Sequence, residues 1–118
     1  MKSIKIKRVY EDKSKNDGYR VFIDRLWPRG VSKEDAHFDE WLKDLAPSTD
    51  LRKWFDHTPD RFDEFRKRYK KELEDHKEEL DKLRNKAKTQ KITLLFAAKD
   101  TAMNNAVVVK EVLEAEQL

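Results

Sequence analysis

The sequence predicts an α/β fold, in which a small parallel or mixed β-sheet of three or more strands carries helices packed on it and a long central helical region. Two short apolar runs, residues 19–23 and 92–98, have the composition of strands that are covered on both faces. Between them, apolar residues recur at helical spacing from residue 62 to about residue 88. A helical connection of this length predicts that the two strands run parallel through a right-handed crossover.

Composition limits the class of protein. The 118 residues are enough for one domain, residues 1–118, and 43% of them are charged. The apolar residues still follow strand and helix spacing, and three Trp and six Phe can build a core, so we expect a folded chain. The net charge is only +3, from 27 basic and 24 acidic residues. This balance disfavours nucleic acid as a partner but does not remove it.

Several chemistries are excluded by residues that are missing or scarce. The absence of cysteine removes disulfides, thiolate metal sites and cysteine nucleophiles. The three histidines form no H-x-x-x-H pair, so no metal is predicted. Two glycines cannot build the usual phosphate-cradling loops, so no cofactor is predicted. No stretch reaches the roughly 18 apolar residues of a membrane span, and the first residues lack a signal-peptide pattern. We therefore expect a cytoplasmic protein without membrane contact, of undetermined oligomeric state.

The first half of the chain predicts two strands and a helix. Ile4 and Ile6 alternate with lysines, which indicates a half-buried strand, and residues 16–18 form a turn signal before the strand at 19–23. After a loop at residues 24–30, Ser32 is expected to cap a helix that Pro47 ends. The apolar stripe of that helix comprises Phe38, Trp41, Leu42 and Leu45.

The second half predicts three further helices around the central strand. Ser48 caps a short helix, and Thr58 with Pro59 begins the long helical region. A break is predicted near residues 74–77, because acidic residues recur there four positions apart. The buried stripe of the long region comprises Phe62, Phe65, Tyr69, Leu73, Leu80, Leu83 and Ala87. After the strand at 92–98 and a loop at 99–105, a final helix is expected to run from Ala106 to Leu118.

Two loops leave the carboxyl ends of the predicted strands, residues 24–30 and 99–105. In sheets of this kind ligands bind at that edge. Arginine suits phosphate or carboxylate groups, tryptophan offers a stacking surface, and a helix N-terminus attracts anions. We therefore predict a pocket for a small anionic molecule, bearing phosphate or carboxylate. Its candidate binding residues are Arg25, Trp27, Arg29, Lys99, Asn104 and Asn105.

Alternative interpretations remain open for the same residues. A second interpretation treats the loop as a structural lock in which Asp24 pairs with Arg25, Arg29 or Arg52. A structural role is favoured for Trp27, because large aromatic side chains dominate cores. A non-thiol enzyme would use as catalytic candidates Asp24, His57 and Asp100. Each also has a purely structural explanation. Asp24 locks the loop, His57 is a helix-end residue, and Asp100 caps a turn. A different function is an interaction module for protein or nucleic acid, using the basic face of the long helix near Arg61, Arg66 and Arg68.

One string, Arg-Leu-Trp-Pro-Arg-Gly at residues 25–30, is specific. With the runs at 21–33, 41–48, 51–57, 65–69, 94–100 and 104–106, it resembles the YeaO-like family, small bacterial or archaeal domains of unknown function. The resemblance covers essentially the whole chain and implies an α/β fold without an established activity. The broader family looks as if it includes longer members with a Cys-His-Arg element after the last strand. This chain has residues 104–106, Asn-Asn-Ala, in that place, so thiol chemistry is not carried over.

Overall fold

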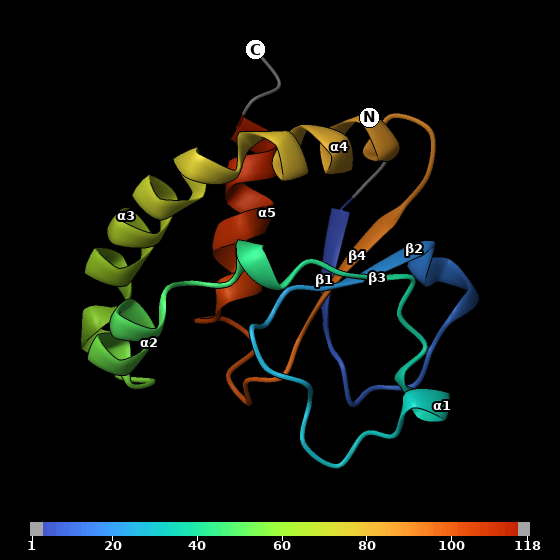
Figure 1. The fold of residues 1–118 in the computed structure, drawn as a ribbon, viewed down its shortest axis with the longest axis horizontal. Coiled ribbons are helices and arrows are strands. Elements are labelled where there is room, and N and C mark those ends of the chain that lie inside the picture. The colour runs from blue at the N-terminus through green and yellow to red at the C-terminus, as the bar shows by residue number, and fades with distance from the viewer. Residues whose placement is uncertain (1–3, 116–118) are drawn as a thin grey trace.

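A four-stranded parallel sheet forms the centre of the molecule (Figure 1). The structure, a computed structural model, describes residues 4–115. The strands are β1 (Ile4–Arg8), β2 (Tyr19–Phe22), β3 (Glu40–Trp41) and β4 (Ile92–Phe96), in the order β1-β4-β2-β3. Every pair is parallel, so the predicted α/β class and the parallel relation of the two apolar strands are confirmed. Because β4 is interior, all five of its residues are buried.

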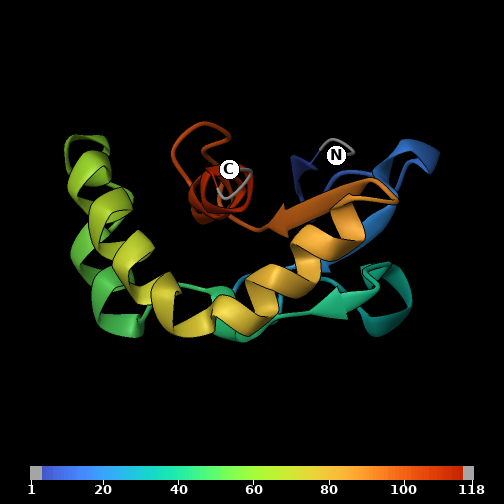
Figure 2. The same ribbon diagram turned by 90° about the horizontal axis from the view of Figure 1, so that it is seen from above.

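The helices are α1 (Lys33–Ala36), α2 (Thr49–Phe55), α3 (Phe62–Leu73), α4 (Lys77–Ala87) and α5 (Asn105–Ala115). Short 3₁₀ turns occupy Lys15–Asp17, Lys43–Leu45, Pro59–Arg61 and Glu74–His76. The predicted break in the long helical region is confirmed, since α3 and α4 meet at an angle at Glu74–His76, with α5 lying inside that angle (Figure 2). The last three residues of the predicted final helix lie outside the described residues. None of the described helices is long and apolar enough to cross a membrane.

The two faces of the sheet are covered differently. On one face, residues such as Val21 and Leu94 join a large core with helices α2 to α5. On the other face, Phe22 and Leu95 belong to a small second cluster, which loop residues cover together with Phe38. The central strands are therefore buried on both sides, as their continuous apolar composition predicts.

The prediction of one helix from Ser32 to Pro47 is wrong. Ser32 does cap α1, accepting a hydrogen bond from the backbone of Asp35 at 3.2 Å, but the helix ends after four residues and His37 adopts a left-handed φ of 51°. The chain then forms β3 beside β2. The apolar residues that were expected on one stripe of this helix are divided between the two cores. Phe38 stacks on Phe22 at 5.3 Å in the small cluster, whereas Leu45 is buried in the helical core.

Candidate functional site

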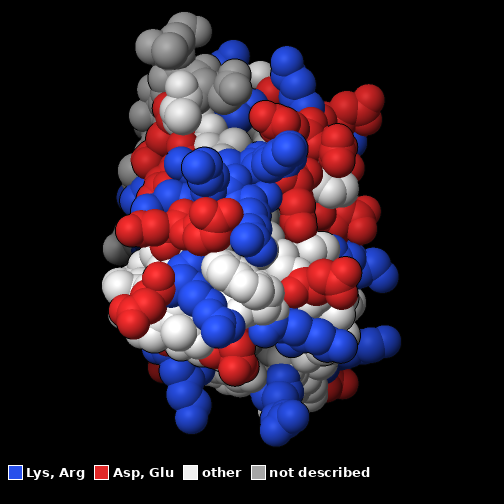
Figure 3. Space-filling view, turned by 90° about the vertical axis from the view of Figure 1, so that its left-hand side faces the viewer, with Lys and Arg blue, Asp and Glu red and all other residues white. Residues whose placement is uncertain are grey.

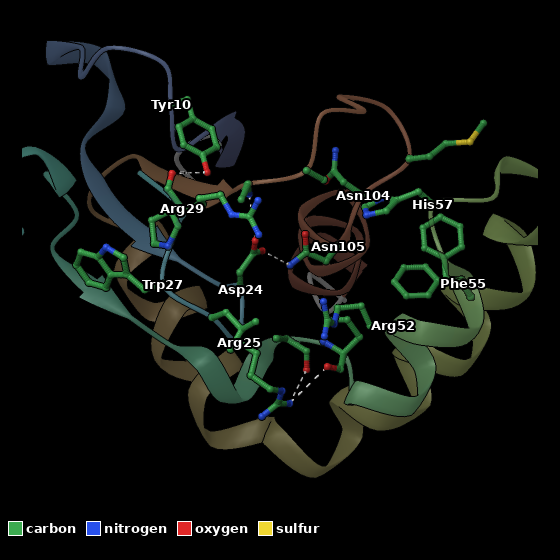
Figure 4. A pocket seen from close by; sticks show the side chains of 18 residues that line it. Tyr10, Asp24, Arg25, Trp27, Arg29, Arg52, Phe55, His57, Asn104 and Asn105 are labelled. Carbon is green, nitrogen blue, oxygen red and sulfur yellow. Dashed lines mark hydrogen bonds between the residues drawn. The ribbon is translucent and has the colours of Figure 1, made fainter. Parts of the chain in front are cut away.

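A pocket of about 330 Å³ lies at the carboxyl edge of the sheet. The loop after β2 and the segment after β4 both border it, together with Tyr10, which follows β1, and helix α2 (Figure 4). Parallel pairing explains this meeting, because all strands present their carboxyl ends to the same side. The two loops that the sequence singled out therefore lie side by side around one cavity.

Two arginines in this pocket lack an internal partner. Arg29 reaches the cavity from the loop after β2, and Arg52 reaches it from α2. Within residues 4–115, neither guanidinium forms a hydrogen bond or an ion pair. Every other arginine donates to a carboxylate or a backbone carbonyl, namely Arg8, Arg20, Arg25, Arg61, Arg66, Arg68 and Arg84. The two arginines without an internal partner thus lie at one place in the fold.

Helix α2 owes its position to a hydrogen-bonded cap. The Ser48 hydroxyl accepts from the backbone of Leu51 at 3.1 Å and donates to the Glu72 carboxylate on α3 at 2.7 Å. The backbone of Ser48 also donates to Glu72, at 2.8 Å. This cap satisfies the first turn of α2 and fixes the helix to α3. Arg52 and the buried ring of Phe55 are consequently held at the pocket wall by a rigid element.

Asp24 follows β2 and lies in the pocket between the side chains of Arg29 and Arg52 (Figure 4). Its carboxylate accepts hydrogen bonds from the backbone of Ala97 at 3.1 Å and from the Asn105 amide at 2.9 Å. Burial raises the pKa of Asp24, although these two hydrogen bonds and the charge of Arg52 oppose the rise. In the described residues it forms no ion pair with an arginine, so the lock ties Asp24 to β4 and α5 instead.

Two of the predicted binding residues line the pocket but are held by the protein. Arg25 donates to the carbonyls of Ala46 and Pro47, each at 3.4 Å, and its guanidinium turns away from the cavity (Figure 4). The Trp27 indole donates to the carbonyl of Val31 at 2.6 Å, and its ring lies 5.4 Å from Phe38 and 5.7 Å from Trp41. Trp27 remains 37% exposed, but its two aromatic neighbours both pack against the small core. These contacts support the structural interpretation of Trp27.

The start of α5 forms another wall. Asn104 is 2% exposed and caps the helix, accepting from the backbone of Val107 at 3.0 Å. Asn105 uses its amide to hold Asp24. Asp100 accepts from two backbone N–H groups of the turn before the helix, and these bonds lower its pKa. Lys99 is exposed, and neither Lys99 nor Asp100 lines the cavity. Asp100 nevertheless lies close enough to His57 for the charge of His57 to contribute to lowering the Asp100 pKa.

His57 borders the cavity on the side of Phe55, whose ring centroid lies 6.3 Å from the imidazole. Asp56 and His57 both have left-handed backbone conformations, with φ of 46° and 52°, which residues other than glycine seldom adopt. Sequence reasoning missed the pocket roles of Arg52, Phe55 and Tyr10. The Tyr10 hydroxyl donates to the backbone carbonyl of Arg29 at 3.0 Å and supports that loop. Arg52 and Phe55 fall within the run at 51–57 that carries the family resemblance, which was the available signal.

The fold and the pocket define a small parallel α/β domain with unpaired arginines at the carboxyl edge of its sheet. The family model described as the inactive DUF488-N3 subclade matches residues 3–118, and the chain belongs to this family. It is 44% identical over 113 residues to the uncharacterized protein YeaO of Escherichia coli (strain K12), covering 96% of this chain and 98% of YeaO, which confirms the YeaO-like resemblance. It is 42% identical over 110 residues to the uncharacterized proteins Rv3073c of Mycobacterium tuberculosis and Mb3100c of Mycobacterium bovis, covering 93% of this chain and 92% of each relative. No solved structure matches the chain significantly.

Proposed function

We propose that this domain binds a small molecule bearing a phosphate or carboxylate group in the carboxyl-edge pocket. The observation that carries the proposal is the pair of guanidinium groups, Arg29 and Arg52, which have no internal partner within residues 4–115 and border the same cavity. A guanidinium presents a planar set of five donors that fits such anions. The cavity volume of about 330 Å³ lies at the lower end of the range for small-molecule sites.

Binding is better supported than catalysis. The family description calls the subclade inactive, and the chain offers no cysteine nucleophile. Of the three catalytic candidates, Asp100 lies outside the pocket lining, and Asp24 is engaged with Ala97 and Asn105. His57 borders the cavity, but the aromatic ring of Phe55 is its neighbour there. A non-thiol enzyme is therefore not the function that we propose.

The alternative interface on the long helix has less support. Figure 3 shows basic and acidic side chains interspersed on the face that carries α2 and α3. Arg68 pairs with Glu64 at 2.8 Å, and Arg66 and Lys70 both pair with Glu111, at 3.0 and 3.1 Å. Cations that are already paired add little attraction for the phosphates of a nucleic acid. We therefore place the functional surface at the pocket.

Arg29→Ala and Arg52→Ala are each expected to weaken binding of phosphate or carboxylate probes by roughly 10- to 100-fold, since hydrogen bonds to charged groups contribute about 1.5–3 kcal/mol. Calorimetric titration with inorganic phosphate, pyrophosphate and small dicarboxylates measures this directly. Lys53→Ala is the matched control, because it removes the same charge from the neighbouring exposed position on α2, outside the pocket lining. It should bind like the wild-type protein. A series in which no probe binds the wild type would refute the proposal.

The same variants separate a binding site from a structural lock. Arg29 is exposed and its guanidinium has no described internal partner, so Arg29→Ala should change the melting temperature by less than about 3 °C. Thermal unfolding without ligand measures this. A large fall in melting temperature combined with unchanged affinity would show that the loop serves the fold and not a ligand.

A further inference from the structure

The pocket also contains a carboxylate with unused bonding capacity. Asp24 is the one acidic side chain among the described residues that line the cavity. Its Oδ2 accepts from the backbone of Ala97 and its Oδ1 from the Asn105 amide. A carboxylate oxygen has two acceptor positions, so each oxygen of Asp24 keeps one that these two partners do not fill. The two internal bonds therefore leave half of its acceptor capacity available.

Opposite charges are kept apart in this cavity. Arg25 is bound to backbone carbonyls, and in the described part of the chain neither Arg29 nor Arg52 comes within 4.0 Å of an acidic oxygen, although Asp24 lies between them (Figure 4). Burial disfavours ionised Asp24 more than its two hydrogen bonds and the charge of Arg52 favour it, so its pKa is raised. A ligand with anionic groups alone would satisfy the arginines but would bring a second negative charge toward Asp24. The charges of the pocket thus match a ligand that carries both kinds of group.

Building on the proposed function, we infer that the pocket selects anions that also carry a hydrogen-bond donor, an ammonium or a hydroxyl group, for Asp24. The anionic group binds Arg29 and Arg52, and the donor binds the free acceptor positions of Asp24. The carbon chain between the two groups lies against the apolar wall, where Phe55 and Phe65 border the cavity. A small amino or hydroxy compound with a phosphate or carboxylate group has this pattern and fits a cavity of about 330 Å³.

A purely structural role explains only part of what Asp24 does. Its bonds to Ala97 and Asn105 tie the end of β2 to β4 and to α5. They account for two acceptor positions and for the presence of a carboxylate, since an asparagine offers only one acceptor oxygen to the two donors. They do not account for a carboxylate that borders a cavity with two unpaired arginines. Discrimination between ligands that differ only in a donor group separates the two roles.

Three phosphate esters of nearly equal size test the inference: 2-aminoethyl phosphate, 2-hydroxyethyl phosphate and propyl phosphate. Titration of the full chain should show that the amino and hydroxyl compounds bind roughly 10-fold more tightly than propyl phosphate, because a site built to bond a donor rejects the analogue that lacks it. The hydroxyl compound has the same charge as propyl phosphate, so net charge cannot produce that difference. The stronger binder of the first two identifies whether the donor is an ammonium or a hydroxyl group.

Asp24→Asn should abolish this preference and strengthen propyl phosphate binding several-fold, because it removes a negative charge from the pocket. Asp44→Asn is the matched control: Asp44 is exposed and lies outside the pocket lining, so the preference should persist. If Asp24→Asn does not fold, the series with the wild-type protein still decides the question. Equal affinities for the three esters would overturn the inference and leave the proposed function standing. If none of the esters binds, nor inorganic phosphate, both are overturned.

Discussion

Replacing Asp17 with asparagine is expected to lower the free energy of unfolding by about 3–5 kcal/mol, the cost of breaking a buried ionic cluster from one side. Asp17 is fully buried and forms ion pairs with Lys5 at 2.9 Å, Lys7 at 3.2 Å and Arg20. Arg20 is itself only 1% exposed, so the variant leaves a buried guanidinium without its counter-charge. Urea unfolding of the two proteins at pH 7 measures the difference.

The same carboxylate predicts how stability depends on pH. Burial alone would raise the pKa of Asp17, but the hydrogen bond from the Ser14 backbone and the three cations outweigh burial and hold this pKa well below its usual 3.8. The unfolded chain therefore takes up a proton more readily than the folded chain. The stabilisation from Asp17 is complete well above pH 3.8 and is lost as the pH falls below that value toward the folded pKa.

Urea unfolding between pH 6 and pH 2 should accordingly show a steeper loss of stability for the wild type than for Asp17→Asn. Asp12→Asn is the control. Asp12 is exposed, and its substitution removes the same charge from the same loop. Its pH dependence should follow that of the wild type. Parallel curves for the wild type and Asp17→Asn would contradict the assignment of the acid sensitivity to this cluster.

The two central strands and the edge that they share could be predicted, because a strand buried on both faces is continuously apolar in sequence. The run at residues 92–98 is continuously apolar, and the matching strand β4 is buried throughout. Parallel order then determines which loops share an edge. The prediction of one helix after Ser32 was wrong because its apolar pattern has more than one structural explanation. Apolar residues at helical spacing, such as Phe38 and Leu45, can serve two different cores when the chain passes between them.

The site could be located from the sequence, but the hydrogen-bond partners of its side chains could not be predicted. Arg25 and Arg29 look equivalent in the loop, yet Arg25 is satisfied by the carbonyls of Ala46 and Pro47. Those acceptors come from a distant segment, and residue spacing does not reveal them. For the same reason, Asn105 could not be identified as the partner that holds Asp24. Which arginines remain unpaired is a property of tertiary structure.

The two edges of the sheet differ in how they treat charge. At the amino edge, Asp17 neutralises part of a cluster of cations and also accepts a hydrogen bond from Thr93 at 2.7 Å through its backbone carbonyl. At the carboxyl edge, Arg29, Arg52 and Asp24 lie around one cavity without forming ion pairs among the described residues. Removing one partner of a compensated buried cluster destabilises a fold, whereas uncompensated charges next to a cavity are available to a ligand. Substitutions at the amino edge should therefore change stability without changing anion affinity per folded molecule.

Gly18→Ala provides the second large effect, an expected loss of roughly 3 kcal/mol of unfolding free energy, from backbone strain and a steric clash together. Gly18 has φ of 64°, and an added Cβ would overlap the carbonyl oxygen of Lys91 and lie 2.9 Å from its carbonyl carbon. That carbonyl accepts the hydrogen bond from Tyr19 at 2.9 Å, at the beginning of the β2–β4 pairing. The Cβ therefore cannot be accommodated without disturbing the centre of the sheet.

Gly30→Ala separates the two contributions. Gly30 also has a positive φ, 78°, but an added Cβ would meet no atom within 4 Å. This variant should lose only about 1 kcal/mol, the cost of the left-handed conformation. Urea unfolding of both variants should thus give unequal losses, with Gly18→Ala the larger by about 2 kcal/mol. Equal losses would show that backbone conformation alone sets the cost, and that the close approach of Gly18 to Lys91 contributes nothing to holding β2 against β4.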